Sequence, residues 1–149
     1  MTDVIKKELM DRVKEHEGYR LDPYLCTEGF LTGGYGHRIL DGEEVPTTKE
    51  GWDKIFEQDF NKAWDSMNEL CAENNLKIHI KAQGILCEMI FQMGKNGVSK
   101  FRNMIKALRG QNYGLASVEM LDSLWSKQTP NRANRLADRM RKSYDSKKT

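Results

Sequence analysis

The hydrophobic and polar positions divide the chain into a short helix, a small region of β-like alternation and a long helical remainder. Apolar residues recur at helical spacing over 4–13, with Thr2 or Asp3 available as the N-cap and Gly18 as the C-terminal stop. Glu17 therefore falls in the last turn of a helix. Because the helix dipole presents its negative end there, this position favours a protonated carboxyl group. Glu17 is a candidate general acid.

The pattern then changes to two short β-like runs, 24–27 and 30–35, separated by a Glu-Gly dipeptide. A glycine at that point supplies the positive φ that a tight hairpin turn requires. The hairpin would place Cys26 and Thr32 on two paired strands near the end of the first helix. A third polar segment, 40–44, is compatible with either a strand or a loop.

The rest of the chain has a helical pattern. Thr47 and Glu50 form a capping box that opens a predicted helix over 48–73, about seven turns long. Three further apolar stripes and a Thr-Pro helix start follow, at 85–93, 98–108, 113–125 and 129–130.

These elements predict an α+β fold, mainly α, in a single domain over residues 1–149. A small N-terminal lobe with a β-hairpin, over about 12–60, is joined by the long helix to a helical lobe formed by 1–11 with 72–149. A chain of 149 residues, 38% of them hydrophobic, is long enough to bury a core of this kind.

Charge is unevenly distributed along the chain. Residues 1–99 hold 12 basic and 18 acidic side chains, whereas residues 100–149 hold 12 basic and 4 acidic ones. A basic half suggests attraction to an anionic polymer or surface, although helices that differ only in solvated charge would give the same count. No nucleic-acid-binding motif is present.

Cysteine content and hydropathy bear on the compartment. The three cysteines, Cys26, Cys71 and Cys87, are too few and of the wrong parity for a disulfide framework, which predicts synthesis in a reducing compartment. We expect Cys71 and Cys87 to be small buried apolar groups. No segment has the length and hydropathy of a membrane span or a signal peptide, so the protein is not expected to export itself.

The segment 17–37 concentrates the candidate chemistry. It places an acid, a thiol, a hydroxyl and an imidazole within twenty-one residues, among glycines that keep side-chain bulk away from the backbone. A cleft floor needs this property if a polymer is to lie close to it. We interpret the segment as an active site.

The spacing within this segment resembles that of the phage lysozyme (endolysin, muramidase) family, and of the T-even phage lysozymes in particular. Eight residues separate Glu17 from Cys26, five separate Cys26 from Thr32, and Gly-x-Gly-His37 follows. Two later blocks, Phe91-Gln92-Met93-Gly94 and Gln128-Thr129-Pro130-Asn131-Arg132, stand in the matching order. The resemblance covers about residues 8–144, and the segment between His37 and Asp59 is shorter than in the T-even enzymes.

The resemblance implies an enzyme that hydrolyses the β-1,4 bond between N-acetylmuramic acid and N-acetylglucosamine of peptidoglycan, with no metal or cofactor. It implies that Glu17 donates a proton to the glycosidic oxygen and that Thr32 helps to hold the attacking water. Cys26 occupies the position usually held by aspartate. A thiolate there can act as a base, as an electrostatic stabiliser or as a nucleophile, and the outcome, inverting or retaining, stays open.

Further roles follow from the same resemblance. His37 and Asp59 would form a structural ion pair, and Arg132 would pair with Glu17. The implied substrate contacts are Gly36, Phe91, Gln92 and Gln128. We also expect a bacteriolytic monomer that is made in the host cytoplasm, reaches the peptidoglycan of the periplasm with the help of a holin, and lyses the host.

Alternatives remain at this point. Asp22 or Glu28 can supply the second carboxylate instead of Cys26. A Cys-His-Asp hydrolase built on Cys26, His37 and Asp59 would leave Glu17 idle and release amines. A lytic transglycosylase would use one acid and no water, and a non-catalytic module would bind the cell wall without cleaving it.

Overall fold

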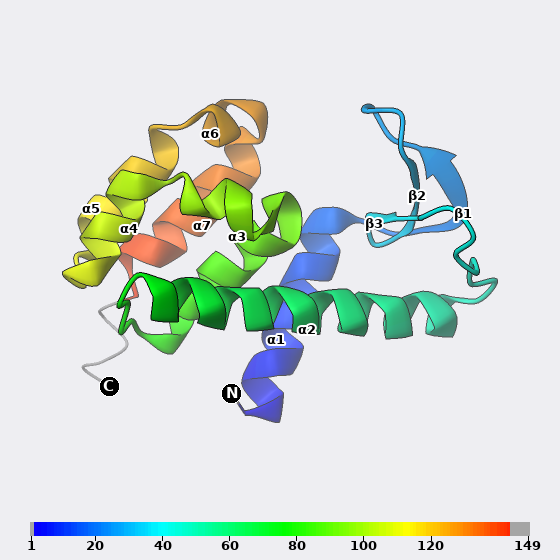
Figure 1. The fold of residues 1–149 in the computed structure, drawn as a ribbon, viewed down its shortest axis with the longest axis horizontal. Coiled ribbons are helices and arrows are strands. Elements are labelled where there is room, and N and C mark those ends of the chain that lie inside the picture. The colour runs from blue at the N-terminus through cyan, green and yellow to red at the C-terminus, as the bar shows by residue number, and fades with distance from the viewer. Residues whose placement is uncertain (1, 144–149) are drawn as a thin grey trace. The chain divides into compact units, whose positions relative to one another are not determined.

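The computed structural model describes residues 2–143 and is mainly helical, with one small sheet near the N-terminus (Figure 1). The predicted α+β, mainly α, fold class is confirmed. The elements in chain order are α1 (Asp3–Glu17), β1 (Arg20–Leu25), β2 (Leu31–Gly34), β3 (His37–Arg38), α2 (Lys49–Glu73), α3 (Ile80–Ser99), α4 (Arg102–Arg109), α5 (Tyr113–Leu121), α6 (Leu124–Gln128) and α7 (Pro130–Arg141).

The chain divides into two compact units, the first ending at Lys62 and the second beginning at Ala63. The boundary lies inside α2, so the long predicted helix belongs to both units. The first unit contains α1 and the sheet, and the second contains the helices from α3 onward. The assignment of residues 1–11 to the helical lobe stays a prediction.

Both ends of α1 are formed as the sequence predicts. Thr2 is the N-cap, and its hydroxyl oxygen accepts a hydrogen bond from the Ile5 N–H at 3.2 Å. Gly18 ends the helix with a φ of +73°, and its N–H donates to the Lys14 carbonyl at 2.9 Å. Only glycine adopts such a φ at little cost, so the helix stops directly after Glu17.

The sheet is antiparallel in the order β1-β2-β3. Tyr24 of β1 lies opposite Thr32 of β2, which in turn lies opposite Arg38 of β3. One side of β2 packs closely on Trp52, because a Cβ atom added to Gly33 or Gly34 would lie 2.5 Å from the indole ring. The glycines of β2 thus let the sheet approach α2, and Trp52 is 1% exposed.

The strands differ in detail from the prediction. β1 begins at Arg20 and ends at Leu25, so Cys26 lies in the turn after the strand and not on it. The segment 40–44 forms a loop, one of the two possibilities that the sequence leaves open, and the third strand is the pair His37–Arg38, which was not predicted. A two-residue strand has no periodicity to detect, which explains why the sequence pattern misses it.

The start of α2 lies one residue later than the capping box suggests. The Thr48 hydroxyl oxygen, not that of Thr47, accepts a hydrogen bond from the Gly51 N–H at 3.1 Å. The Thr48 carbonyl also accepts from the Trp52 N–H at 3.2 Å. Two adjacent threonines offer the same cap chemistry, so the sequence alone does not choose between them.

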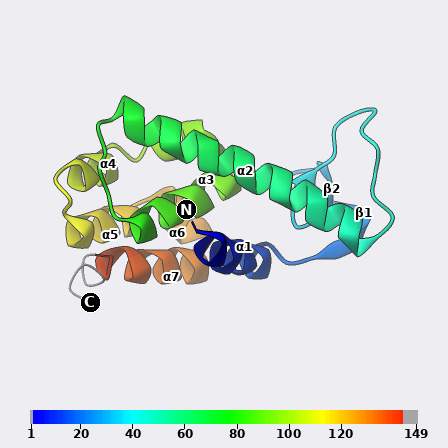
Figure 2. The same cartoon turned by 90° about the horizontal axis from the view of Figure 1, so that it is seen from below.

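In the second unit α5 and α7 lie side by side, α4 packs on α5, and α6 packs on both α5 and α7 (Figures 1 and 2). Gly94 has a φ of +82° and a non-helical backbone, so it interrupts α3 directly after the predicted 85–93 stripe, and helical turns resume as far as Ser99. The predicted 113–125 stripe is two helices, separated at Asp122-Ser123. Cys71 and Cys87 are buried, as expected. Among the described residues, no helix combines the length and apolar character needed to cross a membrane.

Candidate active site

Glu17 is held at the end of α1, half-buried, against the turn that follows β2. A Cβ atom added to Gly36 would lie 2.8 Å from Glu17 Oε2. Gly36 also has a φ of +75°, which disfavours any residue with a side chain. The absence of a side chain at position 36 therefore makes the room that the Glu17 carboxyl group occupies.

Cys26 lies in the tight turn between β1 and β2. Its N–H donates to the Phe30 carbonyl at 3.0 Å, and its own carbonyl accepts from the Gly29 N–H at 2.9 Å. Hydrogen bonds from the backbone N–H groups of Phe30 and Glu28 hold the pKa of the Cys26 thiol below its ordinary value, with a further contribution from the Thr32 hydroxyl. The turn therefore favours the thiolate.

Thr32 is the buried polar residue of β2, at 6% exposure. Its hydroxyl donates to the Phe30 carbonyl at 2.9 Å, and it also interacts with the Cys26 sulfur. A hydroxyl has one proton, so the carbonyl and the thiolate compete for it. When it donates to either, its oxygen lone pairs remain free to accept a hydrogen bond, as from a water molecule.

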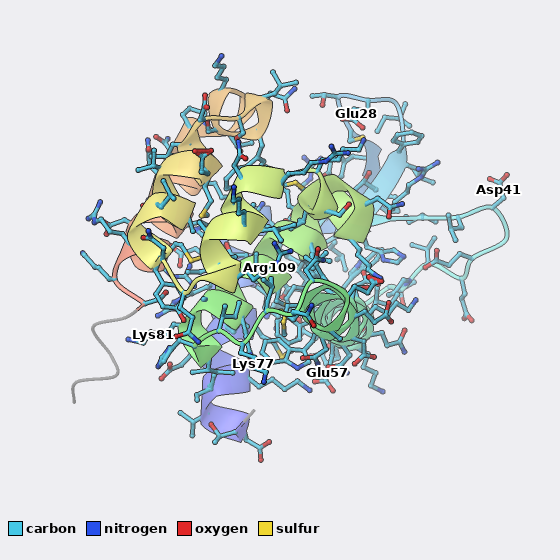
Figure 3. All side chains as sticks on the ribbon, turned by 60° about the vertical axis from the view of Figure 1, so that its left-hand side comes forward. Glu28, Asp41, Glu57, Lys77, Lys81 and Arg109 are labelled. Atoms are coloured by element: carbon cyan, nitrogen blue, oxygen red, sulfur yellow. The ribbon has the colours of Figure 1, made fainter. Side chains whose placement is uncertain are left out.

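The three predicted catalytic residues therefore lie in one unit, on or beside one small sheet. Thr32 is on β2, Cys26 is in the turn before it, and Glu17 contacts the turn after it. The other nearby acids are placed differently. Glu28 lies in the β1–β2 turn (Figure 3) and Asp22 lies within β1, and both are exposed. The catalytic roles themselves stay predictions.

His37 is held between two carboxylates. Its Nδ1 lies 2.6 Å from Asp59 Oδ2, and its Nε2 lies 2.7 Å from Glu43 Oε2. The pKa of His37 is raised, first by the hydrogen bond with Asp59 and then by Glu43, against a lowering by burial. The contact between His37 and Asp59 is the one that the family resemblance implies.

Glu43 was not anticipated from the sequence. Its other carboxylate oxygen accepts a hydrogen bond from the Leu40 N–H at 2.9 Å. The Glu43 side chain therefore bonds both to the backbone of the 40–44 loop and to His37. The pKa of Glu43 is lowered, first by this backbone bond and then by His37. The only available signal was an acid in a short polar loop, which many surface loops share.

A second network in this unit anchors the last turn of α1. Lys14 Nζ lies 3.5 Å from Asp53 Oδ1. It also lies 5.1 Å from the ring centroid of Tyr35 and 5.2 Å from that of Phe56, within the range of a cation–π contact. The Tyr35 hydroxyl donates to Asp53 at 2.7 Å. Burial and this bond raise the pKa of Tyr35. The network connects α1, the turn between β2 and β3, and α2 near Glu17.

The remaining predicted residues are in the second unit. Gln92 lies on α3, two residues before the kink at Gly94, and is half-buried. Its Oε1 accepts a hydrogen bond from Trp125 Nε1 at 2.9 Å. Phe91 is half-buried and Gln128 is exposed. Their predicted contacts with substrate stay predictions.

Arg132 of α7 lies beside a buried acid of α3. Its Nε is 3.7 Å from Glu88 Oε2, and Arg139 Nη1 is 3.4 Å from Glu88 Oε1. Glu88 has no exposed surface. The sequence carries a signal for this cluster, because Glu88 is an acid within an apolar helical stripe and a buried charge requires partners. The predicted pairing of Arg132 with Glu17 stays a prediction.

Among residues 2–143, no group of three or more histidine, cysteine or acidic side chains is arranged to hold a metal ion.

Comparison with known proteins shows which family the chain resembles. A model of the phage lysozyme family matches residues 14–143. A probable T4-type lysozyme 2 of Dictyostelium discoideum is 33% identical over 86% of this chain and 90% of its own. The pre-baseplate central spike protein Gp5 of Enterobacteria phage T4 is 28% identical over 86% of this chain and 26% of its own. The peptidoglycan hydrolase gp36 of Pseudomonas phage phiKMV is 28% identical over 95% of this chain and 16% of its own. The family match spans the sheet, the long helix and the helices of the second unit, and the chain therefore belongs to the phage lysozyme family of glycoside hydrolases.

Proposed function

We propose that the protein hydrolyses the β-1,4 bond between N-acetylmuramic acid and N-acetylglucosamine in bacterial peptidoglycan. The observation that carries this proposal is the grouping of a carboxyl group, a thiol of lowered pKa and a hydroxyl around one small sheet, in a chain of the phage lysozyme family. The name of the phiKMV relative, peptidoglycan hydrolase, supports the same substrate class.

The proposed reaction needs one proton donor and one anion. Glu17 donates its proton to the glycosidic oxygen as the bond to C1 breaks. A water molecule held by Thr32 attacks C1 and gives up a proton to the Cys26 thiolate. The proton balance is restored when the thiol loses that proton to solvent and Glu17 takes one up. With Cys26 as the base the anomeric configuration inverts, whereas attack by the sulfur itself would retain it.

The wider role that we propose is host lysis. In it the protein is a monomer, is made in the host cytoplasm, and reaches the periplasm through a membrane opened by a holin. Its basic C-terminal half would help it to dock on the anionic wall, and salt would weaken that docking.

Mass spectrometry of digested peptidoglycan tests the reaction directly. We expect new reducing ends on muramic acid. Anhydro-muramic ends would indicate a lytic transglycosylase, and new free amines would indicate an amidase or peptidase built on Cys26 and His37. Binding of intact sacculi without any released product would indicate a wall-binding module.

A matched pair of variants tests the acid. Glu17→Gln should abolish product release while the thermal unfolding temperature stays within a few degrees of wild type. Glu15→Gln removes an exposed carboxylate from the same helix and should leave activity unchanged. Near-normal turnover by Glu17→Gln would contradict the assignment of Glu17 as proton donor.

A further inference from the structure

The sheet of the first unit carries two arginines that lie over aromatic rings. The guanidinium carbon of Arg38 is 3.6 Å from the ring centroid of Phe30, and that of Arg20 is 4.5 Å from the ring centroid of Tyr24. Both arginines are exposed. Within the described part of the chain, no carboxylate lies within ion-pair distance of either guanidinium. Their hydrogen-bond donors therefore face solvent.

The register of the sheet places these stacks beside the candidate chemistry. Tyr24 and Arg38 lie opposite Thr32 on either side of it, and directly opposed residues of antiparallel strands share a face. The Phe30 carbonyl accepts hydrogen bonds from both the Cys26 N–H and the Thr32 hydroxyl. The ring that supports the Arg38 guanidinium thus belongs to the residue that positions the thiol and the hydroxyl.

A stacked guanidinium is suited to one kind of ligand. The aromatic ring covers one face of the planar guanidinium and restricts the rotamers of the arginine. The N–H donors at the edge of the guanidinium stay available in the two-pronged geometry that matches a carboxylate. The pKa of the Cys26 thiol is set by Phe30, Glu28 and Thr32, and neither arginine is among the groups that act on it. The two positive charges therefore make no contribution to the shift of the thiol pKa.

We propose that Arg38, assisted by Arg20, binds ionised carboxylates of the peptide stems that hang from the glycan strand. This sheet face then selects strands whose stems are ionised over strands whose stems are neutral or absent. The inference rests on the glycan cleavage proposed above, and it assigns to Arg38 a role in substrate selectivity that is separate from bond cleavage.

Three forms of one substrate test this selectivity. Sacculi freed of secondary wall polymers are used intact, after conversion of their carboxyl groups to amides with carbodiimide and ammonia, and after enzymatic removal of the stems. Release of reducing ends gives kcat/KM for each form. We expect wild type to prefer intact over amidated sacculi by about fivefold, the scale of an exposed but well-oriented arginine–carboxylate pair. The preference should appear in KM and weaken as salt is added.

Variants then locate the preference. Arg38→Gln should bring the ratio of intact to amidated substrate close to one, and Phe30→Leu should lower it because the guanidinium loses its support. Arg38→Lys keeps the charge without the fork and should fall between. Arg12→Gln, which removes an exposed positive charge from α1, should keep the wild-type ratio. Because the ratio is internal to each variant, partial unfolding does not change it.

The outcomes separate this inference from the proposed function. An enzyme that releases reducing ends equally from intact and amidated sacculi contradicts the selectivity but leaves the proposed function standing. So does an Arg38→Gln variant that keeps the wild-type ratio. A wild-type protein that releases no reducing ends from any of the three forms contradicts the proposed function itself, and the selectivity with it.

Discussion

Replacing Asp59 by asparagine tests how the His37 cluster stabilises the first unit. The substitution keeps the size of the side chain and removes the charge that faces His37 Nδ1 at 2.6 Å. The His37 and Asp59 side chains are 19% and 25% exposed, so solvent screens their attraction only in part. A hydrogen bond to a charged group contributes about 1.5–3 kcal/mol, and partial exposure places this one near the lower end.

We therefore expect Asp59→Asn to lower the free energy of unfolding by about 2 kcal/mol at pH 5.5. For a chain of this length, that corresponds to a fall in Tm of about 4–8 °C. Glu43→Gln should cost less, about 1 kcal/mol, because it removes the weaker of the two influences on His37 and leaves a loop side chain that water can solvate. Asp41→Asn, in the same loop (Figure 3), is the matched control and should have no effect.

The pH dependence follows from the direction of the His37 pKa shift. The pKa is raised in the folded protein, so the added stability is present in full below the ordinary histidine value of about 6.5 and is lost as pH rises through the folded pKa. The difference between wild type and Asp59→Asn should thus be largest near pH 5–6 and should shrink at alkaline pH. Titrating groups other than residue 59 and His37 are common to both proteins, and their contributions cancel.

Urea denaturation at a series of pH values measures this difference, and NMR titration of the imidazole gives the folded pKa independently. The difference should decline between the pKa of His37 in Asp59→Asn and the higher pKa of His37 in wild type, each measured by the NMR titration. A difference that is constant from pH 5 to pH 9, or a His37 that titrates at its ordinary value, would refute the reasoning.

Three further predictions concern the candidate site and its support. Because the pKa of Cys26 is lowered and that of the buried Cys87 is raised, iodoacetamide should modify Cys26 first, with loss of activity. Cys26→Ser should be severely impaired and Cys26→Asp should be active. Full activity of Cys26→Ser in a reducing-end assay would count against a role for the thiol. Gly36→Ala adds a methyl group 2.8 Å from Glu17 Oε2 and should lower kcat at least tenfold. Gly42→Ala, at a φ of +79° with no atom nearby, should only lower the free energy of unfolding by the backbone cost of about 1–2 kcal/mol, and equal activities of the two variants would contradict the contact. Glu88→Ala removes the buried carboxylate beside Arg132 and Arg139. It should lower the free energy of unfolding, measured by urea denaturation, by about 3–5 kcal/mol. A loss below about 1 kcal/mol would mean that Glu88 is not the anion that binds these two arginines.

The helices were predictable because their signals are local. α1 begins at Thr2 and stops at Gly18 for reasons that lie within those residues, and the apolar period of α2 extends over its whole length. The grouping of Glu17, Cys26 and Thr32 beside the sheet was predictable because their spacing is that of a known family, whereas the roles of the two later motif blocks stay predictions. Neither kind of inference required knowledge of how distant segments meet.

What the sequence did not reveal depends on contacts between separate segments. Glu43 contacts His37 only after the loop has closed, and the closure uses a bond to Leu40 that no periodic pattern announces. The cluster at Glu88 joins α3 to α7 across 44 residues at Arg132, so the sequence can indicate a buried acid but not which arginines surround it. Thr48, and not the adjacent Thr47, accepts the capping hydrogen bond of α2, and that choice depends on the backbone conformation of the turn.

The cysteine at position 26 shows how local geometry and family motif combine. An aspartate in that position is ionised at neutral pH without help, whereas a thiol of ordinary pKa is mostly protonated. The sequence pattern predicts Cys26 on a strand, whereas Cys26 lies in the turn, where the backbone N–H groups of Phe30 and Glu28 donate to its sulfur and lower its pKa. A strand would have used such donors in its ladder. The position of Cys26 one residue beyond β1 thus favours the thiolate, the negative charge that the proposed reaction requires.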